Sequence, residues 1–259
     1  MKRIFRINYL FIFLSIGCFQ VNAAEKVELL KTDWSFKGLF GKFDRASLQR
    51  GYQVYTEVCA SCHSMKYLSY RNLSEKGGPE FSLEQAKAIA ASFEITDGPN
   101  DDGEMFERPA KLSDKFLMPY ANDKEAQAAN GGAYPPDMSV LAKARSGGVD
   151  YIYSVLLGYE DPPSGVTLDE GVYYNKYMYG NNIKMAQPLS DGLVEYIDGT
   201  EATEEQMAKD VTTFLMWAAE PHLEARHKMG FKAILYLIIL TVLVYFSMKK
   251  IWSRIESEV

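Results

Sequence analysis

The chain has 259 residues, of which 47% are hydrophobic and 24% charged, and its formal net charge is −6. Residues 1–24 and residues 222–259 each carry a net charge of +3, which leaves −12 for the part between them. So acidic a domain does not bind nucleic acid through the phosphates; it suits a basic partner, although the same charge also serves simply to keep an exported domain soluble.

The first 24 residues have the pattern of a secretory signal peptide. Three basic residues precede the apolar run YLFIFLSIGCF, and VNAA supplies small residues for a cut near Ala23 or Ala24. A membrane anchor is the alternative, but the run is short for one. A lipoprotein signal at Cys18 is weaker, because Ser15 stands where a bulky aliphatic residue is usual. The short apolar form is bacterial in type, so we predict an exported domain over residues 25–228.

Export would leave Cys59 and Cys62 as the last two cysteines, and they form the sequence CASCH with His63. A domain of about 200 residues builds a core without disulfides, so this pair is free for other chemistry. A zinc site needs four N or S ligands, yet His222 and His227 lie beside the apolar C-terminal run. A thiol-redox motif would follow a strand, whereas the preceding RASLQRGYQVYTEV favours a helix.

Covalent haem is the interpretation that uses all three residues of the motif. The two thiols add across the porphyrin vinyl groups, and His63 follows at once to face the iron. We therefore predict one covalently attached haem c, held by Cys59 and Cys62, with His63 as an axial ligand. The thiol-redox and zinc-binding modules are kept as alternatives.

The remaining local signals predict helices separated by long loops. The segments 82–93 and 203–221 begin with capping boxes, and 139–148 ends in a Gly-Gly stop. The segment 193–199, LVEYIDG, is predicted as a strand. Long loops rich in Gly, Pro and Asn fill the gaps, and long ordered loops usually wrap a ligand.

An electron-carrying haem needs a sixth ligand, and methionine opposite histidine raises the potential. Five of the eleven methionines lie in or beside loops: Met105, Met118, Met138, Met178 and Met185. Met105 is surrounded by acids and is discounted. Met185 suits best, because it lies in irregular sequence ahead of the last helix of the domain, but chemistry alone leaves its rivals open.

The C-terminal run FKAILYLIILTVLVYFSM predicts a membrane anchor over residues 229–248. Its 18 residues span about 27 Å as a helix, nearly the hydrocarbon thickness of a bilayer. The basic KKIWSR that follows places residues 249–259 in the cytoplasm, and hence the domain before the helix in the periplasm. A buried core helix is the alternative.

Taken together, these blocks resemble the cytochrome c1 family, the membrane-anchored haem subunits of the cytochrome bc1 complex. WSFKGLFGKFDRASLQRGYQVYTEVCASCHSM, YRNL, ANGGAYPPDMSVLAKARSGGVDYIYSVLLGY, NIKMAQPL and AKDVTTFLMWAAEP occur in the family's order, followed by a single anchor. The resemblance implies a mainly α, class I c-type cytochrome fold with long loop insertions and one C-terminal transmembrane helix.

The same resemblance implies the rest of the site. Met185 in MAQPL matches the axial ligand, Arg145 and Tyr151 match contacts to the haem propionates, and Asn130 and Pro136 match pocket residues. Lys184 departs from the family's usual small residue, which would place a charge near the haem edge. Tyr134 and Met138 also depart from the family, at positions where leucine is usual.

The implied function is that of an electron relay, with no bond-making catalysis of its own. Its implied partners are cytochrome b, a Rieske iron–sulfur protein and a soluble cytochrome c, within a dimeric multi-subunit complex of the bacterial inner membrane. A free-standing anchored c-type cytochrome is the alternative.

Overall fold

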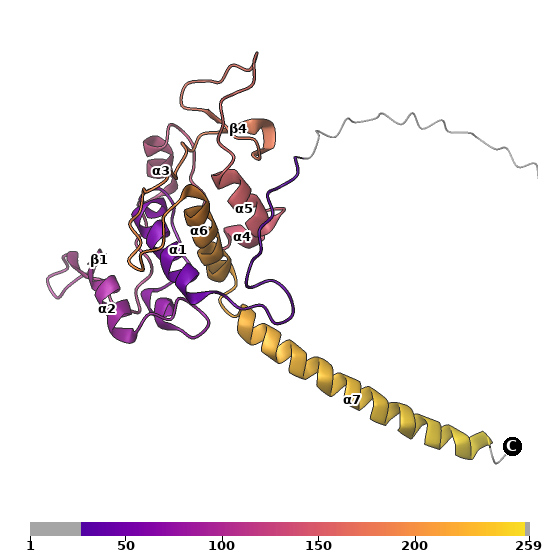
Figure 1. Ribbon diagram of the computed structural model, residues 1–259. Coiled ribbons are helices and arrows are strands. Elements are labelled where there is room, and N and C mark those ends of the chain that lie inside the picture. Colours follow the sequence, from indigo (N-terminus) through magenta and orange to yellow (C-terminus); the bar gives the residue numbers. More distant parts are fainter. Residues whose placement is uncertain (1–26, 257–259) are drawn as a thin grey trace, which may run out of the picture.

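The computed structural model describes residues 27–256, a helical head from which one long helix projects (Figure 1). The signal peptide predicted at 1–24 and the last three residues of the tail lie outside the described residues. The helices are α1 (Arg45–Glu57), α2 (Leu83–Ala91), α3 (Asp123–Ala129), α4 (Leu141–Ala144), α5 (Gly148–Leu156), α6 (Glu204–Ala219) and α7 (Leu223–Glu256), with 3-10 turns η1 (Cys59–Ser61), η2 (Tyr70–Ser74) and η3 (Tyr179–Asn181).

Strands contribute only two short antiparallel pairs. β1 (Glu94–Asp97) pairs with β2 (Phe106–Pro109), and β3 (Tyr173–Tyr174) pairs with β4 (Asn182–Ile183). The mainly α class is therefore confirmed.

Side-chain caps fix where the principal helices begin. Asp44 accepts a hydrogen bond from Ala46 N at 3.0 Å at the start of α1. The predicted capping box of α2 forms, since Ser82 and Gln85 bond reciprocally to each other's backbone N–H. Thr203 accepts from Gln206 N at 3.1 Å at the start of α6. Each cap satisfies N–H groups that the first helical turn leaves without partners.

The core forms where α1 packs against α6, and the two axes approach closely at Gly51. A β-carbon at Gly51 would lie 2.1 Å from the Asp210 carbonyl oxygen and 2.7 Å from Phe214 Cβ. Beside this crossing, the buried Asp210 carboxylate accepts from Arg50 Nε at 2.8 Å and from Ser47 Oγ at 2.6 Å. The pairing compensates the charge that the core encloses.

Gly51→Ala should destabilise the head by an amount on the order of 3 kcal/mol, because backbone of α6 has to move to admit one methyl group. Chemical denaturation of the full chain in detergent measures this. Gly230→Ala is the matched control: no atom lies within 4 Å of its added β-carbon, so stability should stay unchanged or rise slightly. Equal stability of both variants would contradict the close crossing.

Two local predictions were wrong. Residues 193–199 form turns rather than a strand, and they pass over the core with Val194 and Tyr196 buried. The helix predicted at 139–148 is confined to α4, because Arg145 already has extended backbone and Gly147 has a φ of +89°. The β1–β2 hairpin lies in a segment that was expected to be loop.

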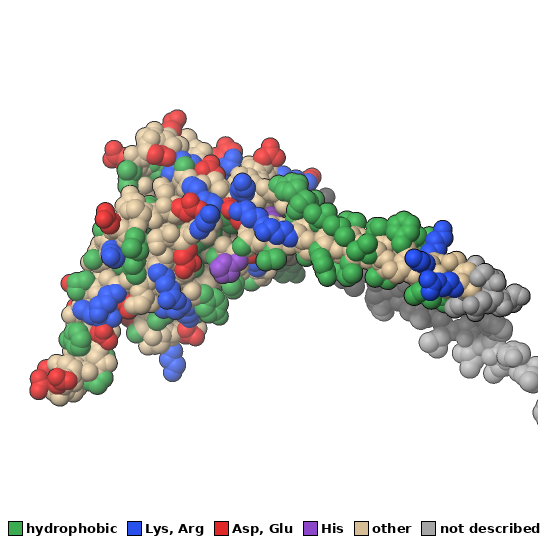
Figure 2. Space-filling model, turned by 90° about the horizontal axis from the view of Figure 1, so that it is seen from below, with side chains coloured by type: hydrophobic (Ala, Val, Ile, Leu, Met, Phe, Trp, Pro, Cys, Tyr) green, Lys and Arg blue, Asp and Glu red, His purple; other side chains and the backbone are tan. Residues whose placement is uncertain are grey.

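Helix α7 begins in the head and continues into the predicted anchor. Its first turn is part of the core, where Leu223 and Glu224 are buried and Glu224 accepts from Phe43 N at 3.0 Å and from Arg45 Nη2 at 3.0 Å. Beyond Met229 hydrophobic side chains cover the surface of the helix on the face shown in Figure 2. Within residues 27–256 this is the one helix that is long and apolar enough to cross a bilayer, and its apolar window is not buried by the head.

Candidate haem-binding site

The CASCH motif folds into a single tight turn directly after α1. The amides of Cys62 and His63 donate to the same Cys59 carbonyl oxygen, at 3.1 and 2.9 Å. Cys59 and the two residues after it form the 3-10 turn η1, one residue beyond the end of α1. The turn brings both thiols and the imidazole onto one short stretch of chain, as covalent attachment of a porphyrin requires.

Both thiols are free and half-buried. Burial, reinforced by the neighbouring Cys62, raises the pKa of the Cys59 thiol to about 12. Redox-active cysteines need the opposite shift, a pKa lowered toward neutrality by a helix N-terminus or a cation. The motif here follows the C-terminus of a helix instead, so the thiol-redox alternative finds no support in the geometry.

His63 is held in the form that a metal ligand needs. Its ring is buried, with an exposed fraction of 8%, and Nδ1 lies 2.8 Å from the Pro136 carbonyl oxygen. A carbonyl only accepts, so Nδ1 carries the proton and Nε2 keeps its lone pair, as a metal ligand requires. Burial also lowers the pKa of His63, which keeps the imidazole neutral. The backbone beside the ring is fixed by Tyr55, whose hydroxyl donates to the His63 carbonyl at 3.2 Å.

Asp137 connects the motif to the segment that supplies Pro136. Its carboxylate accepts from Ser64 Oγ at 2.8 Å, from Lys66 N at 3.0 Å and from Ser139 N at 3.0 Å. Burial opposes its ionisation, but these hydrogen bonds outweigh it and hold the pKa of Asp137 below its usual value. The carboxylate therefore sets the register between two segments that lie 73 residues apart in the sequence.

Asp137→Ala should destabilise the head by about 1–3 kcal/mol, since the Ser64 hydroxyl and the Lys66 backbone N–H lose their shared acceptor. Thermal unfolding followed by circular dichroism measures the loss. Asp137→Asn is the matched variant, because its amide oxygen still accepts from the backbone and should restore part of the stability. An alanine variant as stable as the original chain would show that the carboxylate does not join these segments.

Met185 lies in a loop that is fixed from two directions. Its carbonyl oxygen accepts from Tyr159 OH at 3.0 Å, and the neighbouring Lys184 Nζ donates to the Gly131 carbonyl at 3.0 Å. Lys184 thus directs its charge to the loop that begins after Asn130. The Met185 side chain itself is half-buried. Within residues 27–256 no hydrogen bond joins His63 to the Met185 loop, so each is held by its own set of contacts.

The Asn130 amide donates to the Ala126 carbonyl at 2.7 Å and to Tyr120 OH at 3.0 Å. Tyr151 donates its hydroxyl to Met178 Sδ at 3.1 Å. Arg145 is exposed just beyond α4, where it donates to the Ala144 carbonyl at 3.3 Å. Of the predicted site residues, the structure brings His63 and Pro136 into direct contact and places Lys184 against the loop after Asn130.

The other candidate methionines differ in their surroundings. Met105 is 61% exposed and Met118 48% exposed, whereas Met138 is buried. His222 and His227 lie at the start of α7, and residues 27–256 contain no group of three His, Cys, Asp or Glu side chains that could hold a metal ion. The zinc alternative therefore has no ligand set in the described part of the chain.

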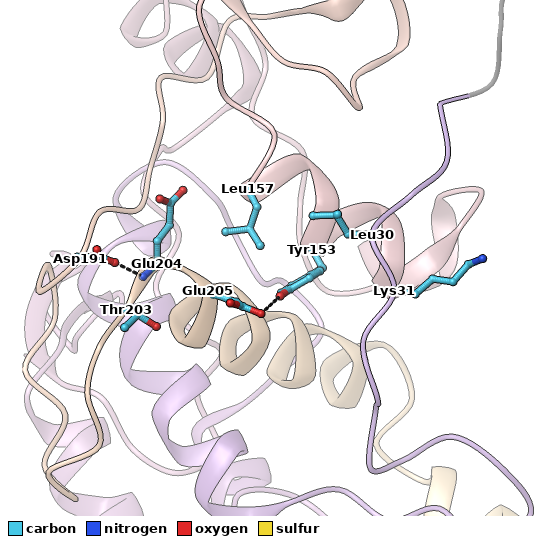
Figure 3. Close-up of a pocket in the computed structure, with 8 residues that line it drawn as sticks. All are labelled: Leu30, Lys31, Tyr153, Leu157, Asp191, Thr203, Glu204 and Glu205. Carbon is cyan, nitrogen blue, oxygen red and sulfur yellow. Dashed lines mark hydrogen bonds between the residues drawn. The ribbon is translucent and has the colours of Figure 1, made fainter.

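Two open cavities lie away from the motif. One, of about 600 Å³, is lined by acidic and apolar side chains from the N-terminal segment, α5 and the start of α6 (Figure 3). In it Tyr153 OH donates to Glu205, and Glu204 N donates to Asp191. The second, of about 450 Å³, lies under residues 192–202. Neither cavity includes a predicted haem residue, so the haem assignment depends on the motif and its contacts.

A family model for the cytochrome c1 family matches residues 34–255. The chain belongs to the cytochrome c1 family. The matched residues include the CASCH motif, the loops that contain Asp137 and Met185, and almost all of α7.

Curated relatives agree with this family assignment. The chain is 53% identical to a cytochrome b/c1 of Bradyrhizobium diazoefficiens over 85% of its own length, although it spans only 35% of that longer protein. It is 47% identical to the cytochrome c1 of Rhodospirillum rubrum over 89% of both proteins. It is 50% identical to a mitochondrial cytochrome c1 haem protein of Arabidopsis thaliana, over 86% of this chain and 72% of the relative.

Sequence reasoning missed three residues that position the site. Tyr55, Asp137 and Tyr159 each bond to a backbone segment that carries a predicted ligand or its neighbour. Asp137 had a usable signal, because an acidic residue after two prolines often caps the turn that follows. The sequence contained no comparable signal for Tyr55 and Tyr159, because their hydroxyls donate to backbone carbonyls rather than to side chains.

Proposed function

We propose that this member of the cytochrome c1 family is the haem-bearing electron-transfer subunit of a cytochrome bc1 complex. The observation that carries the proposal is the pairing of two free thiols with a buried neutral His63 whose Nε2 has no partner among the described residues. Haem c supplies one-electron redox chemistry at its iron; the chain's own residues bind it, orient it and exclude water.

Each predicted residue has a place in this proposal. Cys59 and Cys62 would hold the porphyrin through thioethers, and His63 and Met185 would occupy the two axial positions. The fixed Met185 loop supports its assignment, because a ligand methionine needs an ordered backbone. Pro136 orients the imidazole, while Asn130, Arg145 and Tyr151 would line the pocket and meet the propionates. Arg145 is available for this role, since among residues 27–256 its guanidinium makes one backbone contact and no ion pair.

The proposed electron path runs from a Rieske iron–sulfur protein, through this haem, to a soluble cytochrome c. Cytochrome b would be the neighbour of α7 in the membrane. We further propose that the head lies on the periplasmic side of a bacterial inner membrane, because Lys249, Lys250 and Arg254 follow the apolar run and favour the cytoplasm.

Gentle detergent extraction tests the assembly. The full chain, carrying a C-terminal affinity tag, should co-purify with cytochrome b and a Rieske protein, and the purified complex should reduce cytochrome c when quinol is added. A haem-bearing chain that purifies alone under these conditions would instead support the free-standing anchored cytochrome. A chain without haem would contradict both.

The β1–β2 hairpin offers an acidic surface for a basic cytochrome c. At its base Arg108 pairs with Asp97 and Asp114, so those carboxylates are already compensated. Its tip carries Asp101, Asp102 and Glu104, all exposed, and Figure 2 shows acidic side chains gathered at this extremity. Unpaired exposed acids of this kind accelerate the arrival of a basic protein at low ionic strength.

We expect the triple variant Asp101→Asn, Asp102→Asn and Glu104→Gln to react more slowly with cytochrome c at low salt, with a shallower salt dependence. Stopped-flow rates between low and high ionic strength measure both effects. Glu28→Gln is the control, because it removes an exposed carboxylate that Lys31 already pairs. Salt-independent kinetics in the original chain would exclude steering altogether.

A further inference from the structure

The segment between Trp34 and α1 makes a tight turn whose two central side chains are apolar and exposed. Leu39 is 79% exposed and Phe40 73% exposed, although the chain on both sides of the turn returns to the core. Turn centres are normally occupied by Gly, Asn, Asp, Ser or Pro. Two large hydrophobic residues in such a place indicate a surface that water does not cover in the working protein.

The turn is rigidly built. Gly41 N donates to the Gly38 carbonyl at 3.3 Å, and Lys42 N closes the loop on the Ser35 carbonyl at 3.0 Å. Gly38 has a φ of +88°, and a β-carbon at Gly41 would lie 2.2 Å from the Phe36 carbonyl oxygen. Both glycines are therefore required by the turn, which presents Leu39 and Phe40 in a defined direction.

Both stems of the turn are anchored in the core. Phe36 and Phe43 are buried, and their ring centroids lie 5.1 Å apart. On one stem Lys37 Nζ pairs with Asp150 Oδ2 at 3.0 Å, and on the other Phe43 N donates to Glu224 of α7. The tip therefore cannot fold back onto the head to hide its apolar side chains.

The tip lies beside α7 where the membrane segment starts. The ring of Phe40 is 5.9 Å from that of Phe231, the first residue of the apolar run, and Figure 1 shows the indigo segment before α1 passing the first turns of this helix. Three exposed lysines lie near these residues in the sequence: Lys42 follows the turn, and Lys228 and Lys232 flank Phe231 on α7. Apolar side chains ringed by lysines match the boundary between acyl chains and phosphate headgroups.

We propose that Leu39 and Phe40 insert into the phospholipid surface next to α7, which gives the head a second, peripheral contact with the membrane. The occupant is lipid rather than another subunit, because the apolar tip continues the lipid-facing surface of α7 and the lysines complement anionic headgroups. The contact does not depend on haem or on an electron-transfer partner. Together with the helix it fixes the tilt of the head over the bilayer.

Site-directed spin labelling of the full chain tests this insertion. Leu39→Cys carries the nitroxide, and the chain is reconstituted in vesicles of phosphatidylcholine with phosphatidylglycerol. Collision with oxygen, which concentrates in lipid, is compared with collision with a water-soluble nickel chelate. Ile197→Cys, at a residue 96% exposed on the head, is the aqueous control, and Leu240→Cys within the apolar run is the lipid control. The chain without an added cysteine shows how much label Cys59 and Cys62 take up.

The label at Leu39 should collide more with oxygen than with the nickel chelate, as the label at Leu240 should, whereas the label at Ile197 should collide more with nickel. Replacing phosphatidylglycerol by phosphatidylcholine should reduce the difference between the two collision rates at Leu39. Accessibility like that of Ile197 would place the turn in water and overturn the proposal. Low accessibility to both reagents would show that protein, such as a second copy, covers the turn, and would overturn it equally. Phe40→Cys repeats the measurement at the adjacent residue.

Discussion

Replacing Met185 by leucine should lower the midpoint potential of the haem sharply while leaving the haem attached. A methionine sulfur opposite histidine stabilises the reduced iron, and axial ligation spreads haem potentials over about 0.8 V. Leucine has nearly the same volume, and the Tyr159 bond is to the backbone, so the loop should keep its conformation. Redox titration followed optically measures the shift, and the sulfur-to-iron charge-transfer band should disappear.

The other loop methionines provide matched controls for this experiment. Met118→Leu changes an exposed side chain, and Met178→Leu changes one whose sulfur accepts from Tyr151 OH. Neither should move the potential by a comparable amount. If Met185→Leu left the potential untouched while one of these lowered it, the ligand assignment would have to pass to that residue.

The double variant Cys59→Ser and Cys62→Ser should lose covalent haem entirely, and Cys59→Ser alone should already lose stable attachment. A serine hydroxyl does not add to a vinyl group as a thiol does, whereas the η1 turn depends on backbone hydrogen bonds that both residue types make. Intact mass spectrometry measures the outcome directly, because the variant should weigh no more than its amino acids. Haem staining after denaturing electrophoresis should show no band.

Ser61→Ala is the control for this pair, because it changes the same turn and keeps both thiols, although it removes the weak donation from the Ser61 hydroxyl to Cys62 Sγ at 3.8 Å. The Ser61 hydroxyl donates to the Val58 carbonyl at 2.9 Å, and its loss should leave the haem in place. Covalent haem on the double variant would mean that the porphyrin is attached elsewhere or that the group is not a haem c.

The parts of the fold that the sequence predicted are those that depend on short-range signals. The starts of α2 and α6 follow from capping patterns four residues long, of which the α2 pattern forms the full box and the α6 pattern only the Thr203 cap, and the CASCH turn is contained within five residues. The strand predicted at 193–199 was wrong because Val194 and Tyr196, which alternate with the polar Glu195, resemble a half-buried strand. In the structure, turns place Val194 and Tyr196 in the core without a partner strand.

The haem site depends on long-range contacts, which a single sequence does not contain. The motif itself indicates a thioether-bound haem, but the bond from His63 to Pro136 spans 73 residues, and so does the bond from Ser64 to Asp137. Chemistry reduced the loop methionines to a few candidates, and only the family resemblance singled out Met185. Its support from Tyr159 comes from 26 residues away and needed the structure.

The joint between head and anchor limits how the protein can move. Helix α6 ends at Ala219 and α7 begins at Leu223, so three residues separate them, and the Glu224 carboxylate locks the first turn of α7 to Arg45 and Phe43. A connection this short leaves the head no freedom to rotate relative to α7. A redox centre on this head keeps a fixed height and orientation above the bilayer. Any movement that electron transfer requires therefore has to be made by the molecules that exchange electrons with it.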